Sequence, residues 1–172
     1  MADGCGAELG DIDEACRPLM PLATQAGAAS AQAWAASWTK VAKRIAREAR
    51  EDETRGRVFS AGSKHRRACA CYMLAERQMP PGDPVRLQVY DCMLEHFAHW
   101  QASEEHKVYR VLVPYEGTTL PALFAGAQAD AGPCMVMFDG FDIMKETICL
   151  MECMRHFAAG HLNAGGRSPW RR

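Results

Sequence analysis

The sequence predicts a mainly helical chain with a small α/β segment after the helices, and three observations support this fold class. Residues 30–103 contain three consecutive stretches with apolar side chains at helical spacing. Residues 106–115 and 118–125 form two extended runs around Glu116-Gly117, which is typical of a β-hairpin. A short apolar run at residues 133–138 is followed at once by a tight turn and a helix start.

The size and composition of the chain restrict its class. Its 172 residues can hold one ordinary domain, or a small domain and part of another. The net charge of −1 favours neither nucleic acid nor a membrane surface. The N-terminus lacks a secretory signal, and no stretch approaches the roughly 18 apolar residues of a membrane span. We therefore expect a cytoplasmic protein without a membrane partner, in which the eight cysteines are reduced.

Residues 1–29 have no sustained period and are interpreted as a flexible leader, with at most a helical turn near residues 11–17. Ser30 is a suitable N-cap for the first long helix, which is expected to end near Arg50. Five apolar side chains of this helix share one face and are predicted to enter the core: Trp34, Trp38, Val41, Ile45 and Ala49.

A second helix is predicted between residues 54 and 78, although Gly56 and Gly62 favour an interruption. Its core candidates are Phe59, Ala68, Cys69, Tyr72, Met73 and Ala75.

After the Pro80-Pro81-Gly82 break, Asp83 and Pro84 are a strong start signal for a third helix reaching about Ala102. Its predicted core face contains Val85, Val89, Cys92, Met93, His96, Phe97 and Trp100. The three helices are expected to pack together as one domain, residues 30–103.

The hairpin, the apolar run and a helix at residues 142–158 form the second predicted domain, residues 104–159. The run at 133–138 is predicted to be a strand buried on both faces, because it is almost wholly apolar and bounded by turn residues. Residues 160–172 lack periodicity and are predicted to be a disordered tail.

Two motifs that follow the helical stretches resemble one branch of the α/β-hydrolases. They are Val-Pro-Tyr-Glu-Gly-Thr-Thr-Leu-Pro at 113–121 and Phe-Asp-Gly-Phe-Asp-Ile-Met-Lys-Glu at 138–146. The branch is that of dihydroxypseudooxynicotine hydrolase, the fungal polyketide-shortening hydrolases and the fermentation-respiration-switch type esterases. The resemblance covers about residues 30–158 and implies a helical cap-like unit followed by the first strands and first helix of an incomplete hydrolase core.

The resemblance implies serine-type hydrolysis of a small-molecule ester, carbonyl compound or activated carbon–carbon bond, without a cofactor. In such enzymes the loop after the third strand contributes a backbone amide to the oxyanion hole. Matched to this sequence, that loop consists of Asp139, Gly140, Phe141 and Asp142. A plain strand-to-helix turn is the alternative interpretation of these residues.

No catalytic residue is identifiable, because the family's G-x-S-x-G nucleophile motif does not occur in the sequence. The segment around Ser168 has only the first half of that motif, and Pro169 would remove the amide that the oxyanion hole needs. We therefore expect a truncated, mis-spliced or frameshifted relative that is inactive as this chain.

The spacing of the histidines and cysteines does not match a known metal-site motif. His96, His99 and His106 lie close in sequence, but Glu95-His96-Phe97-Ala98-His99 does not match a metalloprotease motif. The C-x-C and C-x₃-C pairs at Cys69/Cys71 and Cys149/Cys153 lack zinc-ribbon spacing and suit buried side chains. A core or interface histidine is the commoner outcome for His96, and no metal site is expected.

Two further function classes remain. The basic stretch from Lys40 to Arg67 can be posed as a phosphate-binding surface, but acidic residues interrupt it and a charged helix face explains it better. The other alternative is a non-catalytic helical protein that binds a partner or forms a homo-oligomer. In that case aromatic side chains of the helices that once covered an active site would face solvent.

Overall fold

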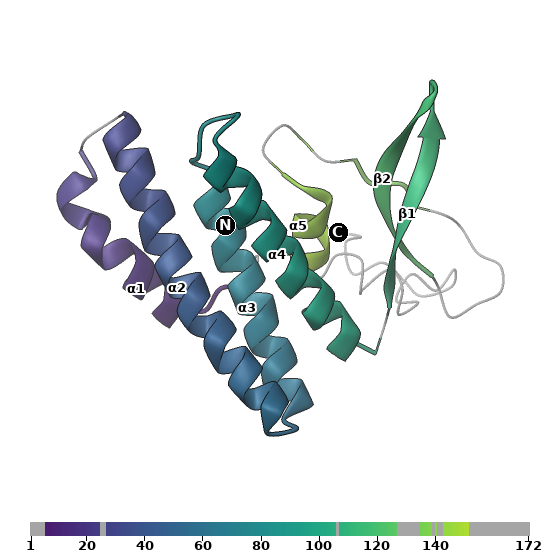
Figure 1. The fold of residues 1–172 in the computed structure, drawn as a ribbon, viewed down its shortest axis with the longest axis horizontal. Helices are drawn as coiled ribbons and strands as arrows, with labels where there is room; N and C mark the ends of the chain where they lie inside the picture. Colours follow the sequence, from purple (N-terminus) through teal and green to yellow (C-terminus); the bar gives the residue numbers. More distant parts are fainter. Residues whose placement is uncertain are drawn as a thin grey trace, which may run out of the picture. The chain divides into compact units, whose positions relative to one another are not determined.

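The computed structural model describes residues 6–24, 27–105, 107–126, 135–138, 140 and 143–151. The chain divides into two compact units, Met1–Glu104 and Glu105–Arg172. The first unit contains α1 (Leu9–Cys16), the 3₁₀ helix η2 (Arg17–Leu22), α2 (Ala28–Thr54), α3 (Val58–Glu76) and α4 (Pro84–Ser103) (Figure 1). The second contains β1 (Val108–Tyr115), β2 (Thr118–Ala125) and α5 (Lys145–Leu150). The described residues are thus mostly helical, with a small two-stranded antiparallel sheet.

Helix α2 extends beyond its predicted bounds at both ends. It begins at Ala28, with Gly27 rather than Ser30 at the N-cap, and it continues past Arg50 to Thr54. The chain turns out of the helix at Gly56, just after the C-cap Arg55, and the φ of Gly56, 69°, is in the left-handed region that glycine adopts without steric cost. The amide of Arg57 donates to the Asp52 carbonyl at 2.9 Å, and the amide of Gly56 donates to the Glu53 carbonyl at 2.9 Å. These two bonds form a Schellman motif, which fixes Asp52 and Glu53 in the last turn of the helix.

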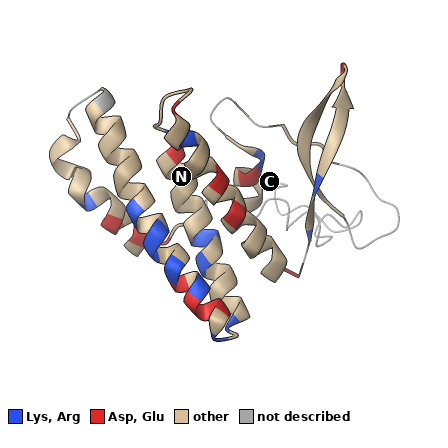
Figure 2. Cartoon of the chain, in the orientation of Figure 1, with Lys and Arg blue, Asp and Glu red and all other residues tan. Residues whose placement is uncertain are grey.

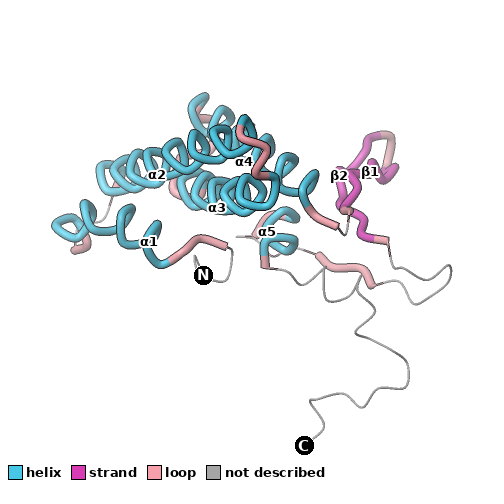
Figure 3. The backbone as a smooth tube through the Cα atoms, turned by 90° about the horizontal axis from the view of Figure 1, so that it is seen from below, coloured by secondary structure: helices cyan, strands magenta, loops and turns pink. Residues whose placement is uncertain are grey.

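The core of the first unit lies along α3, which packs between α2 and α4 (Figures 1 and 3). The predicted apolar face of α2 is largely confirmed: Trp38, Val41, Ile45 and Ala49 are buried, and Trp34 is half-buried. Helix α3 contributes a continuous buried stretch from Ala68 to Glu76. The buried face of α4 consists of Val89, Met93, His96, Phe97 and Trp100.

Two predicted core residues are exposed instead. Phe59 is 89% exposed and Val85 is 49% exposed, and both lie in the first turn of a helix. The helix start at Asp83 is confirmed: its side chain accepts a hydrogen bond from the Val85 amide at 2.8 Å, and Pro84 takes the first helical position.

The N-terminal segment is ordered where it is described, in contrast to the predicted flexible leader. Residues 9–22 form α1 and η2, and α1 packs against α2 with Asp11 and Ala15 buried. The Ser37 hydroxyl donates to the Ala15 carbonyl at 2.7 Å, which ties α1 to α2. The interactions that hold this segment therefore come from residues far along the chain, which leave no periodic pattern in residues 1–29.

The predicted hairpin is confirmed. Strands β1 and β2 pair in antiparallel register from Val108↔Ala125 to Tyr115↔Thr118. Glu116 and Gly117 form the two-residue turn with φ of 42° and 80°, and two positive φ values are the mark of a type I′ turn.

The predicted buried strand at 133–138 is wrong for the residues that the structure describes. Residues 135–138 form no regular secondary structure, and all four are exposed, with Phe138 at 88%. An apolar run becomes a buried strand only where strands pair with it and layers cover both faces, and the described residues supply neither. Within the predicted helix 142–158, α5 occupies Lys145–Leu150, and residues 152–172, with the predicted tail, lie outside the described residues.

Two further findings bear on the class of protein. None of the helices in the described residues has the length and apolar character needed to cross a membrane. None of the cysteines that the structure describes forms a disulfide: Cys16, Cys69, Cys71, Cys92 and Cys149.

Candidate functional site

The loop matched to an oxyanion hole is described only at Gly140, because Asp139, Phe141 and Asp142 lie outside the described residues. Gly140 is exposed, and its carbonyl accepts a hydrogen bond from the Ile143 amide at 3.3 Å. A Cβ built on Gly140 meets no atom within 4 Å, and its φ is not in the left-handed region. Neither local packing nor φ therefore requires glycine there, and the oxyanion assignment stays a prediction.

Basic and acidic residues are interspersed along α2 and α3 (Figure 2), and several cations of the basic stretch pair with carboxylates. Arg44 contacts Glu14 and Glu48, with nitrogen–oxygen distances of 2.7 and 2.8 Å. Lys64 Nζ lies 2.6 Å from an oxygen of Asp52, and Arg57 also contacts that carboxylate. The hydrogen bonds from Lys64 and Ser60 lower the pKa of Asp52 to about 2. These cations are engaged within the fold rather than arrayed for phosphate.

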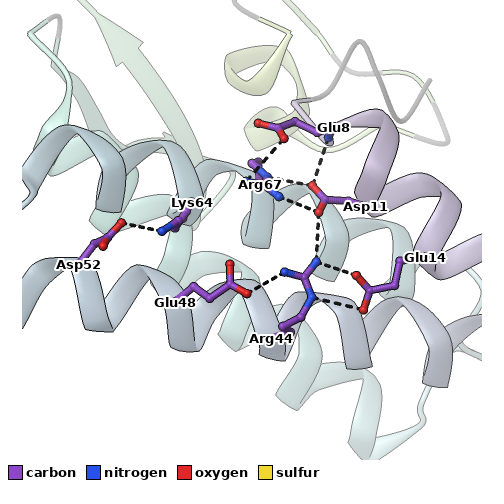
Figure 4. Close-up of polar contacts among 8 residues, drawn as sticks. All are labelled: Glu8, Asp11, Glu14, Arg44, Glu48, Asp52, Lys64 and Arg67. Carbon is purple, nitrogen blue, oxygen red and sulfur yellow. Dashed lines mark hydrogen bonds and ion pairs between the residues drawn. The ribbon is translucent and has the colours of Figure 1, made fainter.

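A buried carboxylate anchors α1 to α2 and α3 (Figure 4). Arg67 donates to both oxygens of Asp11, at 2.8 Å from Nε and 2.7 Å from Nη2, and Arg44 Nη2 lies 3.3 Å from the same carboxylate. Burial by itself would raise the pKa of Asp11, but the hydrogen bonds and charge of Arg67 outweigh it, so the pKa is lowered. This cluster has the geometry of a structural clamp.

The described residues bring a second polar cluster together where α2, α3 and α4 meet. Glu53 Oε1 lies 3.0 Å from His65 Nε2 and 3.0 Å from His99 Nδ1. The rings of His65 and His99 stack with centroids 4.6 Å apart. One donor atom from each of Glu53, His65 and His99 lies within 4.8 Å of the other two.

A fourth residue, His96, continues this cluster into the interior. His65 Nδ1 and His96 Nδ1 are 2.7 Å apart, and each of the two side chains is 1% exposed. Burial lowers the pKa of His65, although the Glu53 carboxylate opposes this effect. Burial and the neighbouring His65 lower the pKa of His96 to about 4. Both shifts favour the neutral form, in which each ring has one nitrogen without a proton that can accept a hydrogen bond or bind a metal.

The sequence singled out only part of this cluster. His96 and His99 were considered together, but the structure directs His96 toward His65 and His99 toward Glu53. His106 lies outside the described residues. Glu53 and His65 were missed, because a carboxylate and a histidine twelve residues apart on different helices match no ligand spacing. The Gly56 interruption was the one local signal, since it folds α3 back beside the end of α2.

Comparison with known proteins adds no assignment. No protein-family model matches the chain, and no curated protein matches it.

Proposed function

We propose that residues 30–158 correspond to the helical region and the opening part of an α/β-hydrolase, and that this chain does not itself carry out hydrolysis. The observation that carries the proposal is the state of the hairpin. It includes the first motif, residues 113–121, with its turn at Glu116-Gly117, and the side chains on one of its faces are apolar and exposed.

The register defines that face, because residues directly opposite each other on antiparallel strands point the same way. Tyr109 pairs with Phe124, and Val113 pairs with Leu120. We call the side chains on this side the hairpin face: Tyr109, Val111, Val113, Tyr115, Leu120 and Phe124. Each is at least 36% exposed, and Tyr109 reaches 58%. A two-stranded sheet is marginally stable alone, so such a face suits a sheet that takes further strands or a covering layer.

The reaction class follows from the resemblance alone. A serine hydrolase needs a nucleophile, a general base with its orienting acid, and paired amides for the oxyanion. Of these, the sequence offers only the loop Asp139–Asp142, and it contains no G-x-S-x-G. The substrate of the ancestral activity would be a small-molecule ester or activated carbon–carbon bond. A cytoplasmic location is part of this proposal, and the described cysteines, none of which forms a disulfide, support it.

A serine-directed fluorophosphonate tests the absence of turnover. Incubation of the purified chain should label no serine above the background of the heat-denatured chain, and a p-nitrophenyl ester should not be hydrolysed. An active serine esterase treated in parallel controls for the reagent. Labelling near one equivalent would contradict the proposal, because it would show an activated serine that the sequence does not reveal.

The hairpin face also favours a second candidate function, self-association of this chain. Replacing Tyr109 and Leu120 by threonine should keep the strands, since threonine suits a β-sheet, while removing much of the apolar surface. We expect the unaltered chain to form dimers or larger species in light scattering and the double variant to be monomeric. Leu112→Thr is the matched control, because Leu112 is 68% exposed on the opposite face of β1. A monomeric unaltered chain that binds no hydrophobic dye would remove this candidate.

A further inference from the structure

We propose that Glu53, His65 and His99 bind a divalent transition-metal ion of the zinc class. One carboxylate and two imidazoles are a donor set used by zinc enzymes and by non-haem iron sites. Helices α2, α3 and α4 each contribute one of these side chains, and the candidate donor atoms lie within 4.8 Å of one another. The inference goes beyond the proposed hydrolase ancestry and does not depend on it, because all three residues belong to the helical unit.

The donor atoms can bind a small metal ion once the exposed ligands turn toward it. Protein ligands of zinc lie about 2.0–2.2 Å from the metal, so tetrahedral donors are about 3.3 Å apart. Glu53 Oε1 is 3.0 Å from each histidine nitrogen, and the donor atoms of the three residues span up to 4.8 Å, so the two histidine nitrogens must approach each other by up to about 1.5 Å. The exposed side chains can make these shifts: Glu53 is 38% and His99 is 44% exposed, whereas His65 is fixed by burial.

A metal-binding histidine requires a hydrogen-bond partner for its other ring nitrogen, and for His65 this partner is His96. Without metal, the Glu53 carboxylate can only accept, so His65 Nε2 donates to it and His65 Nδ1 accepts from His96 Nδ1. To bind metal through Nε2, His65 must hold its proton on Nδ1 and donate it to His96 Nδ1. The proton of His96 must then move from Nδ1 to Nε2, so each ring still carries one proton and the number of protons on the pair is unchanged. Such a partner fixes the tautomer and ring orientation of the ligand.

The surrounding charges permit a dication to bind. The nearby cations are paired with other carboxylates: Lys64 and Arg57 with Asp52, and Arg50 with Glu95. Glu53 therefore keeps its negative charge for the site. Because Glu53 and His99 are partly exposed, three protein ligands leave a coordination position open to water, as in zinc sites that act on substrates.

Titration of the full chain with Co²⁺ and Zn²⁺ under reducing conditions tests the site. We expect one tight equivalent, with a cobalt d–d spectrum that lacks thiolate charge-transfer bands. Glu53→Gln and His99→Gln should each weaken binding by more than about 100-fold, and His96→Gln by about 10–100-fold, the range for outer contacts. Glu51→Gln changes an exposed glutamate of the same helix and should leave affinity unaltered. Circular dichroism checks that each variant is folded.

Two further readouts decide the interpretation. Imidazole ¹⁵N shifts should show the proton of His65 moving from Nε2 to Nδ1 when Zn²⁺ is added, which a merely hydrogen-bonded cluster would not do. The proposal is overturned if the unaltered chain binds neither metal, if Glu53→Gln and His99→Gln bind as tightly as the unaltered chain, or if binding disappears only when the cysteines are alkylated.

Discussion

Replacing Asp11 with asparagine should lower the free energy of unfolding by about 3 kcal/mol, and it should release α1 from the helical unit. Asparagine has nearly the same shape, but it removes the charge that Arg67 and Arg44 approach. Breaking a buried ion pair by removing one partner costs about 3–5 kcal/mol, because the remaining charge is left buried without compensation. We choose the lower end of that range because the Arg67 side chain is still 18% exposed. Urea unfolding followed by circular dichroism measures the loss.

Asp13→Asn is the control for this clamp. Asp13 lies two residues further along α1 and pairs with Arg17, and both of these side chains are mostly exposed. Exposed ion pairs contribute about 0–1 kcal/mol, so this variant should be nearly as stable as the unaltered chain. Limited proteolysis adds a local readout, because cleavage within residues 9–22 should accelerate in Asp11→Asn alone. Equal effects of the two substitutions would contradict a clamp at Asp11.

The pH dependence provides a second readout of the same interaction. The pKa of Asp11 is lowered in the folded protein, so the unfolded chain binds the proton more readily. The stability that this carboxylate contributes is fully present above the pKa of an unfolded aspartate, about 3.9, and is lost as the pH falls through the folded value. The unfolding free energy of Asp11→Asn should therefore fall less steeply below about pH 4 than that of the unaltered chain.

The sequence predicted those elements that depend on residues close to one another in the chain. The helix start at Asp83 and the hairpin turn at Glu116-Gly117 each depend on a few neighbouring residues, and both were predicted from the sequence. The order of α1 could not be predicted in the same way, because Asp11 is held by residues 33 and 56 positions away. The prediction of a strand at 133–138 was wrong for a related reason. The composition of this run suits a strand, but pairing partners decide whether a strand forms.

The histidine cluster could likewise be predicted only in part from the sequence. The one-turn spacing of His96 and His99 is visible in the sequence, yet His96 contacts His65 and His99 contacts Glu53. Their partners come from α2 and α3, and the angle between packed helices decides which side chains converge. Glu53 and His65 became candidates only when the Schellman turn at Gly56 had placed the end of α2 beside α3.

Replacing Trp38 with alanine should cost about 3–5 kcal/mol of unfolding free energy, the range for deleting a large aromatic side chain from a core. Trp38 is 1% exposed and lies in the middle of the α2 face that packs on α3. Its indole Nε1 is buried and has no hydrogen-bond partner among the described residues. Trp38→Phe should therefore cost less than Trp38→Ala, because it fills part of the space and removes a buried polar group.

Phe59→Ala distinguishes the exposure of Phe59 in the structure from the burial that the sequence pattern predicts. Both Trp38 and Phe59 were predicted core residues, but Phe59 is 89% exposed in the structure. Its replacement should change stability by no more than about 0.5 kcal/mol, as for other surface substitutions. Chemical unfolding should thus rank the variants Phe59→Ala, Trp38→Phe and Trp38→Ala in order of increasing loss. A cost for Phe59→Ala comparable with that of Trp38→Ala would show that the start of α3 is buried, and the packing of α3 described here would be wrong.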